Sequence, residues 1–259
     1  MNTKDKTKAK ETMREQIYCD SKRERGALYS FPPPLIINFY KQLPIAKNYK
    51  QVDANIRRKI VVVTMDDNYD LFLDNLLAKN NVPATWFPVV NELVPELKNK
   101  EVEFHFNKDM GSIESQKKKF IEKMGYTPRI NRNHRLWWRS DNIDFAYLSL
   151  HGILADSTKI GITPYKPCVQ GRILPIWEIP FAFFEPSCVS VMRAGYSLVE
   201  NMETLFRNNV TPIVGTFHPL NLEKYHHFSS QLEKFIRLGR KYHYNFMSLK
   251  QLLNLLQDQ

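Results

Sequence analysis

The stretch KIVVVTMDD, residues 59–67, decides the fold of this 259-residue chain. Its run of apolar, β-branched residues is typical of a buried strand, and that strand ends at two adjacent carboxylates, Asp66 and Asp67. Residues 70–79 follow with leucines at helical spacing, which predicts a helix that packs Leu71 and its neighbours on the strand. A strand followed at once by a covering helix indicates a β/α unit.

The same alternation continues along the rest of the chain. Further strands are predicted at residues 84–90 and 101–106, and apolar segments that end at polar residues follow at 148–156, 173–180 and 211–218. Helical patterns occur at 112–123, about 194–208 and 229–241, and a loop after the first of these contains Arg132 and His134. Strands that alternate with helices favour parallel β/α units, and a β/α barrel places catalytic groups at the C-terminal ends of its strands.

Positive charge is concentrated at the start of the chain. The formal net charge is +10, but residues 1–59 carry 14 basic and 6 acidic side chains, so the remainder is nearly neutral. A nucleic-acid-binding fold is therefore not expected, because its basic surface should extend over the folded body. We divide the chain into a basic N-terminal arm with a lead-in segment, residues 1–55, and a barrel domain, residues 56–259. The arm would suit peripheral contact with a membrane or an acidic carrier.

Composition and segment patterns exclude several other classes. The chain is 43% hydrophobic and 25% charged, as in ordinary globular proteins. No apolar run has the length of a membrane span, and the N-terminus does not have the pattern of a signal peptide, so we expect a cytoplasmic protein. Three cysteines without paired spacing predict neither a disulfide framework nor a zinc knot.

The two carboxylates that end the first strand are the first candidates for chemistry. Like charges this close together raise each other's pKa unless a metal or an arginine compensates them. One carboxylate could bind a divalent metal while the other accepts a proton from water. The alternative is structural, because Asp66 or Asp67 could cap the helix that follows.

Histidines and arginines mark the other strand ends. His105 is predicted near the end of the strand at 101–106, and His218 directly follows the apolar run at 211–218. The segment 129–139 contains four arginines, a histidine and two tryptophans, which would suit either nucleic-acid contacts or a ligand site with a sugar platform. Each histidine could instead be an ordinary core or surface residue.

Taken in order, these segments resemble the polysaccharide deacetylases of the NodB homology, carbohydrate esterase family four, type. The matching segments are TMDDN (64–68), NVPATWF (81–87), EFH (103–105), RNH (132–134), DST (156–158), LPIWEIP (174–180) and TFHP (216–219). The resemblance covers about residues 59–250. It implies a distorted (β/α)7-type barrel and metal-dependent removal of an acetyl group from an N-acetylated sugar.

Three departures from the family pattern bear on the site. Asn68 stands where the family has a glycine. Asparagine suits this position because, like glycine, it accepts left-handed backbone conformations. The family's HxxxH pair is incomplete, because Asp109 stands four residues after His105. The arginine motif reads RNH and lacks its proline. Two ligand sets are therefore open, namely Asp67 and His105 with Asp109, or the same two residues with His134. We favour His134, because zinc prefers nitrogen ligands and commonly keeps three protein ligands.

The resemblance also implies roles for the remaining residues. Asp66 would be the base, Arg132 would orient it, and His218 would protonate the departing amine. Asp156 and the tryptophans Trp137, Trp138 and Trp177 are candidates for contact with the carbohydrate substrate, although the core is the favoured place for each tryptophan. The expected cofactor is a divalent metal, with zinc favoured. The alternative function is a catalytically inactive barrel that binds carbohydrate or acts as a scaffold.

Overall fold

The computed structural model describes residues 52–136, 143–159, 161–169, 172–184, 198–219 and 226–258. Almost all of the predicted arm, together with Trp137 and Trp138, therefore lies outside the described residues. The first described strand, β1 (Val52–Asp53), pairs antiparallel with β8 (Tyr165–Lys166). These two residues belong to a sheet although they precede the predicted domain boundary at residue 56.

The stretch KIVVVTMDD, residues 59–67, forms the central strand of one sheet. Strand β2 (Ile60–Asp67) is buried along almost its whole length. It pairs in parallel with β13 (Ile213–Phe217) on one side and with β3 (Ala84–Pro88) and β14 (Asn245–Met247) on the other. Strand β12 (Phe183–Phe184) and strand β4 (Glu101–Val102) extend the sheet at its edges.

A second sheet continues the ring of strands. Its parallel members are β5 (Phe104–Phe106), β6 (Ile130–Asn133), β7 (Ala155–Asp156) and β11 (Trp177–Glu178). A parallel bridge between Val89 and His105 connects it to the first sheet. Strands β9 (Cys168–Val169) and β10 (Arg172–Ile173) form a separate hairpin. The neighbouring carboxyl ends of parallel strands therefore meet at one end of the barrel, as predicted.

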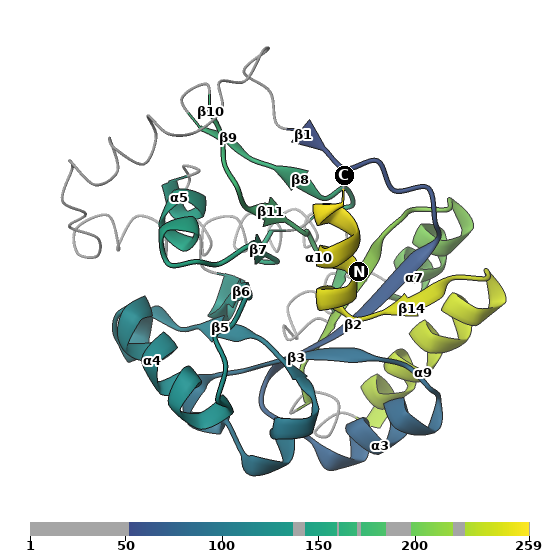
Figure 1. The fold of residues 1–259 in the computed structure, drawn as a ribbon. Coiled ribbons are helices and arrows are strands. Elements are labelled where there is room, and N and C mark those ends of the chain that lie inside the picture. Colours follow the sequence, from purple (N-terminus) through teal and green to yellow (C-terminus); the bar gives the residue numbers. More distant parts are fainter. Residues whose placement is uncertain are drawn as a thin grey trace, which may run out of the picture.

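Helices cover the outside of this ring and close one end of it (Figure 1). The helices are α3 (Leu71–Lys79), α4 (Ile113–Met124), α5 (Ile143–Leu150), α7 (Leu198–Arg207), α9 (His226–Lys241) and α10 (Leu249–Gln257). Leu249, Leu252, Leu253 and Leu256 of α10 share a core cluster with Ile60 and Val62, so α10 packs against the start of β2 and leaves the carboxyl ends of the strands for the site.

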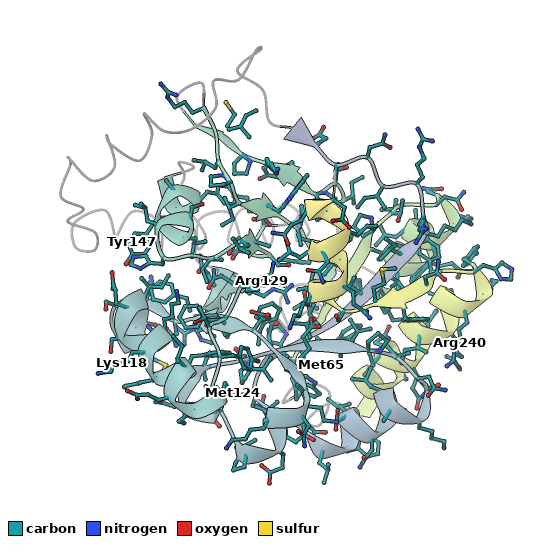
Figure 2. All side chains as sticks on the ribbon, viewed as in Figure 1. Met65, Lys118, Met124, Arg129, Tyr147 and Arg240 are labelled. Carbon is teal, nitrogen blue, oxygen red and sulfur yellow. The ribbon has the colours of Figure 1, made fainter. Side chains whose placement is uncertain are left out.

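Side chains follow the expected division between core and surface. Met65 is fully buried in the layer between strands and helices, whereas Lys118 of α4 and Arg240 of α9 point outward (Figure 2). Among the described residues, no helix combines the length and apolar character that a bilayer span requires. Four 3-10 turns complete the described elements: Val90–Glu92, Pro95–Asn99, Lys108–Met110 and His134–Leu136.

Most predicted elements are confirmed, but several details are wrong. The apolar segment at 148–156 is not one element, because residues 148–150 end the helix α5 and the strand β7 begins only at Ala155. Leu71 does not cover the strand, because its side chain is 61% exposed and α3 instead buries Leu73 and Leu77. Arg132 lies on strand β6 and not in a loop. The strand β14 and the helix α10 were not predicted, and they form the C-terminal part of the described fold.

Candidate metal centre

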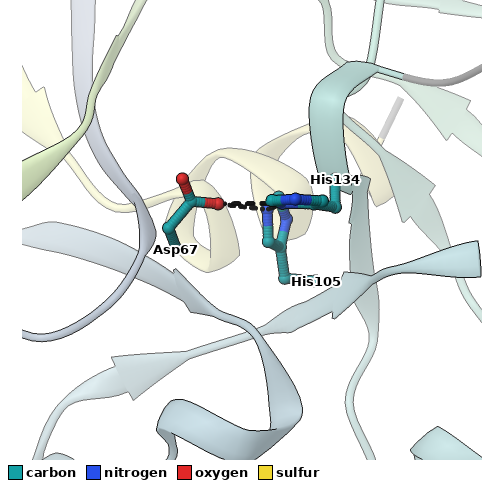
Figure 3. A group of neighbouring side chains, drawn as sticks. All are labelled: Asp67, His105 and His134. Carbon is teal, nitrogen blue, oxygen red and sulfur yellow. Dashed lines mark hydrogen bonds and ion pairs between the residues drawn. The ribbon is translucent and has the colours of Figure 1, made fainter. Parts of the chain in front are cut away.

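Three predicted ligands come together at the carboxyl ends of neighbouring strands (Figure 3). Asp67 Oδ1 lies 3.2 Å from His105 Nε2 and 2.9 Å from His134 Nδ1, and the two ring nitrogens are 3.3 Å apart. Asp67 ends β2, His105 is the middle residue of β5, and His134 directly follows β6. The three side chains therefore converge from three separate strands.

The backbone at Asp67 is unusual and explains how two consecutive aspartates face one region. Asp67 has a φ of 73°, and the N–H of Asn68 donates to the carbonyl of Asp66 at 3.0 Å, which makes a γ-turn at the strand end. In a regular strand the two side chains would point to opposite faces. The left-handed residue is thus Asp67 and not the predicted Asn68, and the turn redirects the Asp67 carboxylate.

His105 is oriented by the strand beside it. Its Nδ1 lies 3.0 Å from the carbonyl oxygen of Arg132, and the side chain is 2% exposed. A carbonyl only accepts hydrogen bonds, so Nδ1 carries a hydrogen and Nε2 is the ring atom directed at Asp67. This arrangement is the usual one for a histidine that binds a metal.

The spacing of the three potential ligand atoms fits a metal. A carboxylate oxygen and a ring nitrogen this close together need a cation or a proton between them. Tetrahedral zinc with ligands at about 2.0–2.1 Å separates neighbouring ligand atoms by about 3.3–3.4 Å. The observed separations of 2.9, 3.2 and 3.3 Å are close to this value.

Electrostatics keep Asp67 in the form that a metal needs. Burial alone would raise the pKa of this carboxyl group, but hydrogen bonds from His105 and His134 lower it further than burial raises it. The net effect is a pKa well below the ordinary value. Asp67 is therefore a carboxylate.

Asp66 occupies a different environment next to this group. It is 2% exposed and accepts a hydrogen bond of 2.8 Å from a terminal nitrogen of Arg132. The guanidinium also donates to Thr64 Oγ1 at 2.6 Å. Two further bonds go to Ser157, to its carbonyl at 2.8 Å and to its hydroxyl at 2.7 Å. Arg132 is thus fixed at four points, and it holds Asp66 as an ion pair.

Several residues that support Arg132 were not singled out from the sequence. Its guanidinium lies between the rings of Phe87 and Phe181, at 4.7 and 5.6 Å from their centroids. Thr64 and Ser157 supply the hydrogen-bond acceptors described above. Thr64 could have been found from the alternation of β2, because it faces the same side as Asp66. The two phenylalanines carry no signal that separates them from ordinary core residues.

His218 follows β13 at the same end of the barrel. Phe217 pairs with Met65, so His218 stands one residue beyond that pair and beside the Asp66–Asp67 end of β2. The side chain is half-buried, and its charge is one of the influences that lower the pKa of Asp67. The predicted acid is therefore near the metal group.

The other predicted site residues lie elsewhere. In the part of the chain that the structure describes, Asp109 is not in the ligand group; its side chain is 57% exposed and lies 3.8 Å from Arg135. Asp156 is fully buried and Trp177 is 4% exposed, so neither side chain offers a surface to a sugar in this structure. This differs from the predicted substrate contacts. Trp137 lies outside the described residues.

The dense arginine segment at 129–139 does not act as one cluster. Arg129 donates to Gln257 of α10 at 2.8 Å, Arg132 is buried beside Asp66, and Arg135 is largely exposed. Only Arg132 of these three belongs to the site.

Comparisons with known proteins identify the fold. No protein-family model and no curated protein matches the chain. A solved structure from Mycobacterium smegmatis, named for polysaccharide deacetylase, aligns with a TM-score of 0.56 at 15% identity, over 84% of this chain and 96% of that one. A mutant of peptidoglycan deacetylase PdaC from Bacillus subtilis aligns with a TM-score of 0.50 at 12% identity, over 79% and 94%.

A third neighbour is a mutant of a carbohydrate esterase family 4 pseudoenzyme with restored enzymatic activity. It aligns with a TM-score of 0.50 at 13% identity, over 78% of this chain and 70% of that one. Structural likeness at such low sequence identity shows the fold alone. The chain is an α/β barrel with a converging Asp/His/His group, and its fold is the distorted (β/α)7 barrel of the NodB-like carbohydrate esterases of family 4.

Proposed function

We propose that this chain is a metal-dependent hydrolase that removes the acetyl group from an N-acetylated sugar of a glycan or glycan precursor. The observation that carries the proposal is the convergence of Asp67, His105 and His134 beside the buried Asp66–Arg132 ion pair. Likeness to deacetylase folds supports the reaction class. Zinc is the proposed metal, because two imidazole nitrogens and one carboxylate oxygen are a common zinc ligand set.

The roles of the residues follow from their environments. Asp67, His105 and His134 would hold the metal, which when bound polarises the acetyl carbonyl and lowers the pKa of water. Asp66 accepts a proton from the attacking water, and Arg132 holds its carboxylate in one orientation. His218 donates a proton to the nitrogen as the amide C–N bond breaks. The products are acetate and a free amino sugar.

A pair of conservative variants tests this division of roles. Asp66→Asn removes the proposed base but no ligand, so it should abolish acetate release from N-acetylated sugars and leave zinc content unchanged. Asp70→Asn is the matched control, because Asp70 caps α3 by accepting from the N–H of Leu73, and asparagine also caps helices. It should keep both activity and zinc. Full activity in Asp66→Asn would exclude Asp66 as the base.

The outcome of that experiment also decides between enzyme and binding protein. Wild-type chain that binds zinc but releases no acetate from any N-acetylated sugar would support the inactive barrel that binds carbohydrate. Wild-type chain that binds no zinc would remove the basis of the metal mechanism.

A further inference from the structure

Three buried polar side chains form a row beside the proposed site. Asn131 on β6, Asp156 on β7 and Glu178 on β11 are aligned in register across the three strands, so their side chains lie on the same face. All three are fully buried. Two ionised carboxyl groups in adjacent buried positions are costly, because no water solvates their charges and the two charges repel each other.

The hydrogen bonds around the two acids are unequal. Asp156 Oδ1 accepts from Asn131 Nδ2 at 2.6 Å and from the Thr158 hydroxyl at 3.0 Å, and Oδ2 accepts from the Thr158 N–H at 3.0 Å. Glu178 Oε1 accepts from the N–H of Lys159 at 3.0 Å, while its Oε2 is buried with no donor among the described residues. Both oxygens of Asp156 thus face donors, as those of a carboxylate should.

Other ionisable groups surround the pair. Lys159, which follows β7, is attracted to both carboxyl groups and to Asp144 of α5, and its ammonium lies 4.8 Å from the centroid of the Phe145 ring. Tyr165 of β8 pairs with Glu178 across the sheet. Burial raises the pKa of Glu178 well above its ordinary value, and the neighbouring Asp156 raises it further.

We infer that Asp156 and Glu178 share one proton, that Glu178 carries it and donates it to Asp156, and that the pair positions the segment bearing His134. Asp156 and Glu178 are positioning residues, because they act on the proposed ligands through other residues. Protonation makes Glu178 Oε2 a donor, and the Asp156 carboxylate then serves as its acceptor. The charge then remains on Asp156, where the Asn131 and Thr158 donors stabilise it.

Two hydrogen bonds carry the effect from the pair to the site. The Thr158 hydroxyl, which donates to Asp156, accepts from the N–H of Asn133 at 3.0 Å. Asn131 Nδ2, which also donates to Asp156, reaches Asn133 Oδ1 at 2.9 Å. Asn133 directly precedes His134. Asp156 therefore fixes the two partners that hold the residue before a proposed ligand.

Two amide variants of the full chain test the assignment of the proton. Glu178→Gln mimics the protonated acid, because its NH₂ donates to Asp156 and its oxygen accepts from Lys159. It should keep wild-type zinc affinity and the wild-type melting temperature at pH 6. Asp156→Asn places an NH₂ group against the donors of Asn131 and Thr158. It should lower the melting temperature and weaken zinc binding by about 10–100-fold, measured by competition with a chromogenic chelator.

The pH dependence gives a readout that a purely structural role would not change. The raised pKa of Glu178 means that its contribution to stability is present at low pH and is lost as pH rises through the folded-state value. Wild-type melting temperature should therefore fall more between pH 6 and pH 9 than that of Glu178→Gln. At pH 6 the infrared difference between wild type and Glu178→Gln should contain the C=O stretch of one protonated carboxyl group. Burial raises the pKa of Glu103 to about 7, so its signal occurs in both chains and cancels in the difference.

The contrary outcomes are distinct. Equal pH dependence in wild type and Glu178→Gln would overturn the shared proton, and a tolerated Asp156→Asn with a damaged Glu178→Gln would place the proton on Asp156. Wild-type zinc affinity in a folded Asp156→Asn would overturn the positioning role. The zinc measurement rests on the proposed function, but the melting and infrared measurements do not. If the wild type binds no zinc, the proposed metal site is wrong, but the melting and infrared measurements still assign the proton. If Asp156→Asn does not fold, the measurements on Glu178→Gln assign the proton.

Discussion

Replacing Arg132 with methionine should be one of the most damaging single changes in this protein. The guanidinium is fully buried and makes four hydrogen bonds of 2.6–2.8 Å, one of them to Asp66. Methionine is close to arginine in length, so Arg132→Met removes the charge and the donors while filling much of the space. It leaves Asp66, which is 2% exposed, as a buried carboxylate without its cation.

The magnitude follows from that unpaired charge. Removing one partner of a buried ion pair costs about 3–5 kcal/mol. In a domain of this size, each kcal/mol lowers the melting temperature by about 2–4 °C, so Arg132→Met should melt roughly 6–20 °C below the wild type. Deacetylase activity should fall by about 10²–10⁴-fold, because a misplaced base loses the benefit of general base catalysis.

The assay is urea unfolding, with the midpoint and the slope measured for four chains. These are the wild type, Arg132→Met, Asp66→Asn and the double variant. Because the double variant contains no unpaired charge, its loss should be smaller than the sum of the single losses by about 1–3 kcal/mol. Arg135→Met is the matched control, since Arg135 is 76% exposed and lies 3.8 Å from Asp109. It should change stability by less than about 0.5 kcal/mol.

Two results would refute this reasoning. A loss below about 1 kcal/mol in Arg132→Met would mean that Asp66 does not depend on this cation. Strictly additive losses in the double variant would mean that the two residues do not interact energetically, whatever their separation of 2.8 Å.

Three further changes probe the ligand set, the support of the arginine and the packing. His134→Ala should lose bound zinc by elemental analysis while Asp109→Ala retains it, and the reverse result would favour the ligand set with Asp109. Ser157→Ala removes one hydroxyl acceptor of the buried guanidinium at 2.7 Å and should cost about 1–2 kcal/mol in urea unfolding, with zinc content unchanged. Gly215→Ala would place a Cβ 2.7 Å from a ring carbon of Phe235 and should cost about 1–3 kcal/mol; a neutral melting temperature would show that the ring can move aside.

The parts of the fold that follow a local pattern could be predicted from the sequence. Strand β2 is a continuous apolar run, and α4 begins at the capping residue Ser112 and ends at Gly125, which has a left-handed φ of 80°. Each of these signals lies within or next to the element that it predicts. The two carboxylates at the end of β2 could be recognised for the same reason.

The parts that depend on distant partners could not be predicted in the same way. Residues 130–133, INRN, contain no apolar alternation, yet they form a buried strand because Asn131, Arg132 and Asn133 all find hydrogen-bond partners in the interior. Leu71 was expected inside, but it lies in the first turn of α3, on the side away from the barrel. The sequence predicts a substrate contact at Asp156. Its partners Asn131 and Glu178 are distant in the sequence and can be identified only from the pairing of the strands.

The central claim is that Asp67, His105 and His134 form a metal site that supports deacetylation. The most direct measurement is elemental analysis of the purified chain after equilibration with zinc, combined with acetate release from a panel of N-acetylated sugars before and after chelation. We predict one zinc ion per chain, and acetate release that chelation abolishes and added zinc restores. A chain that binds no zinc, or one that releases acetate at an undiminished rate after complete metal removal, would contradict the claim.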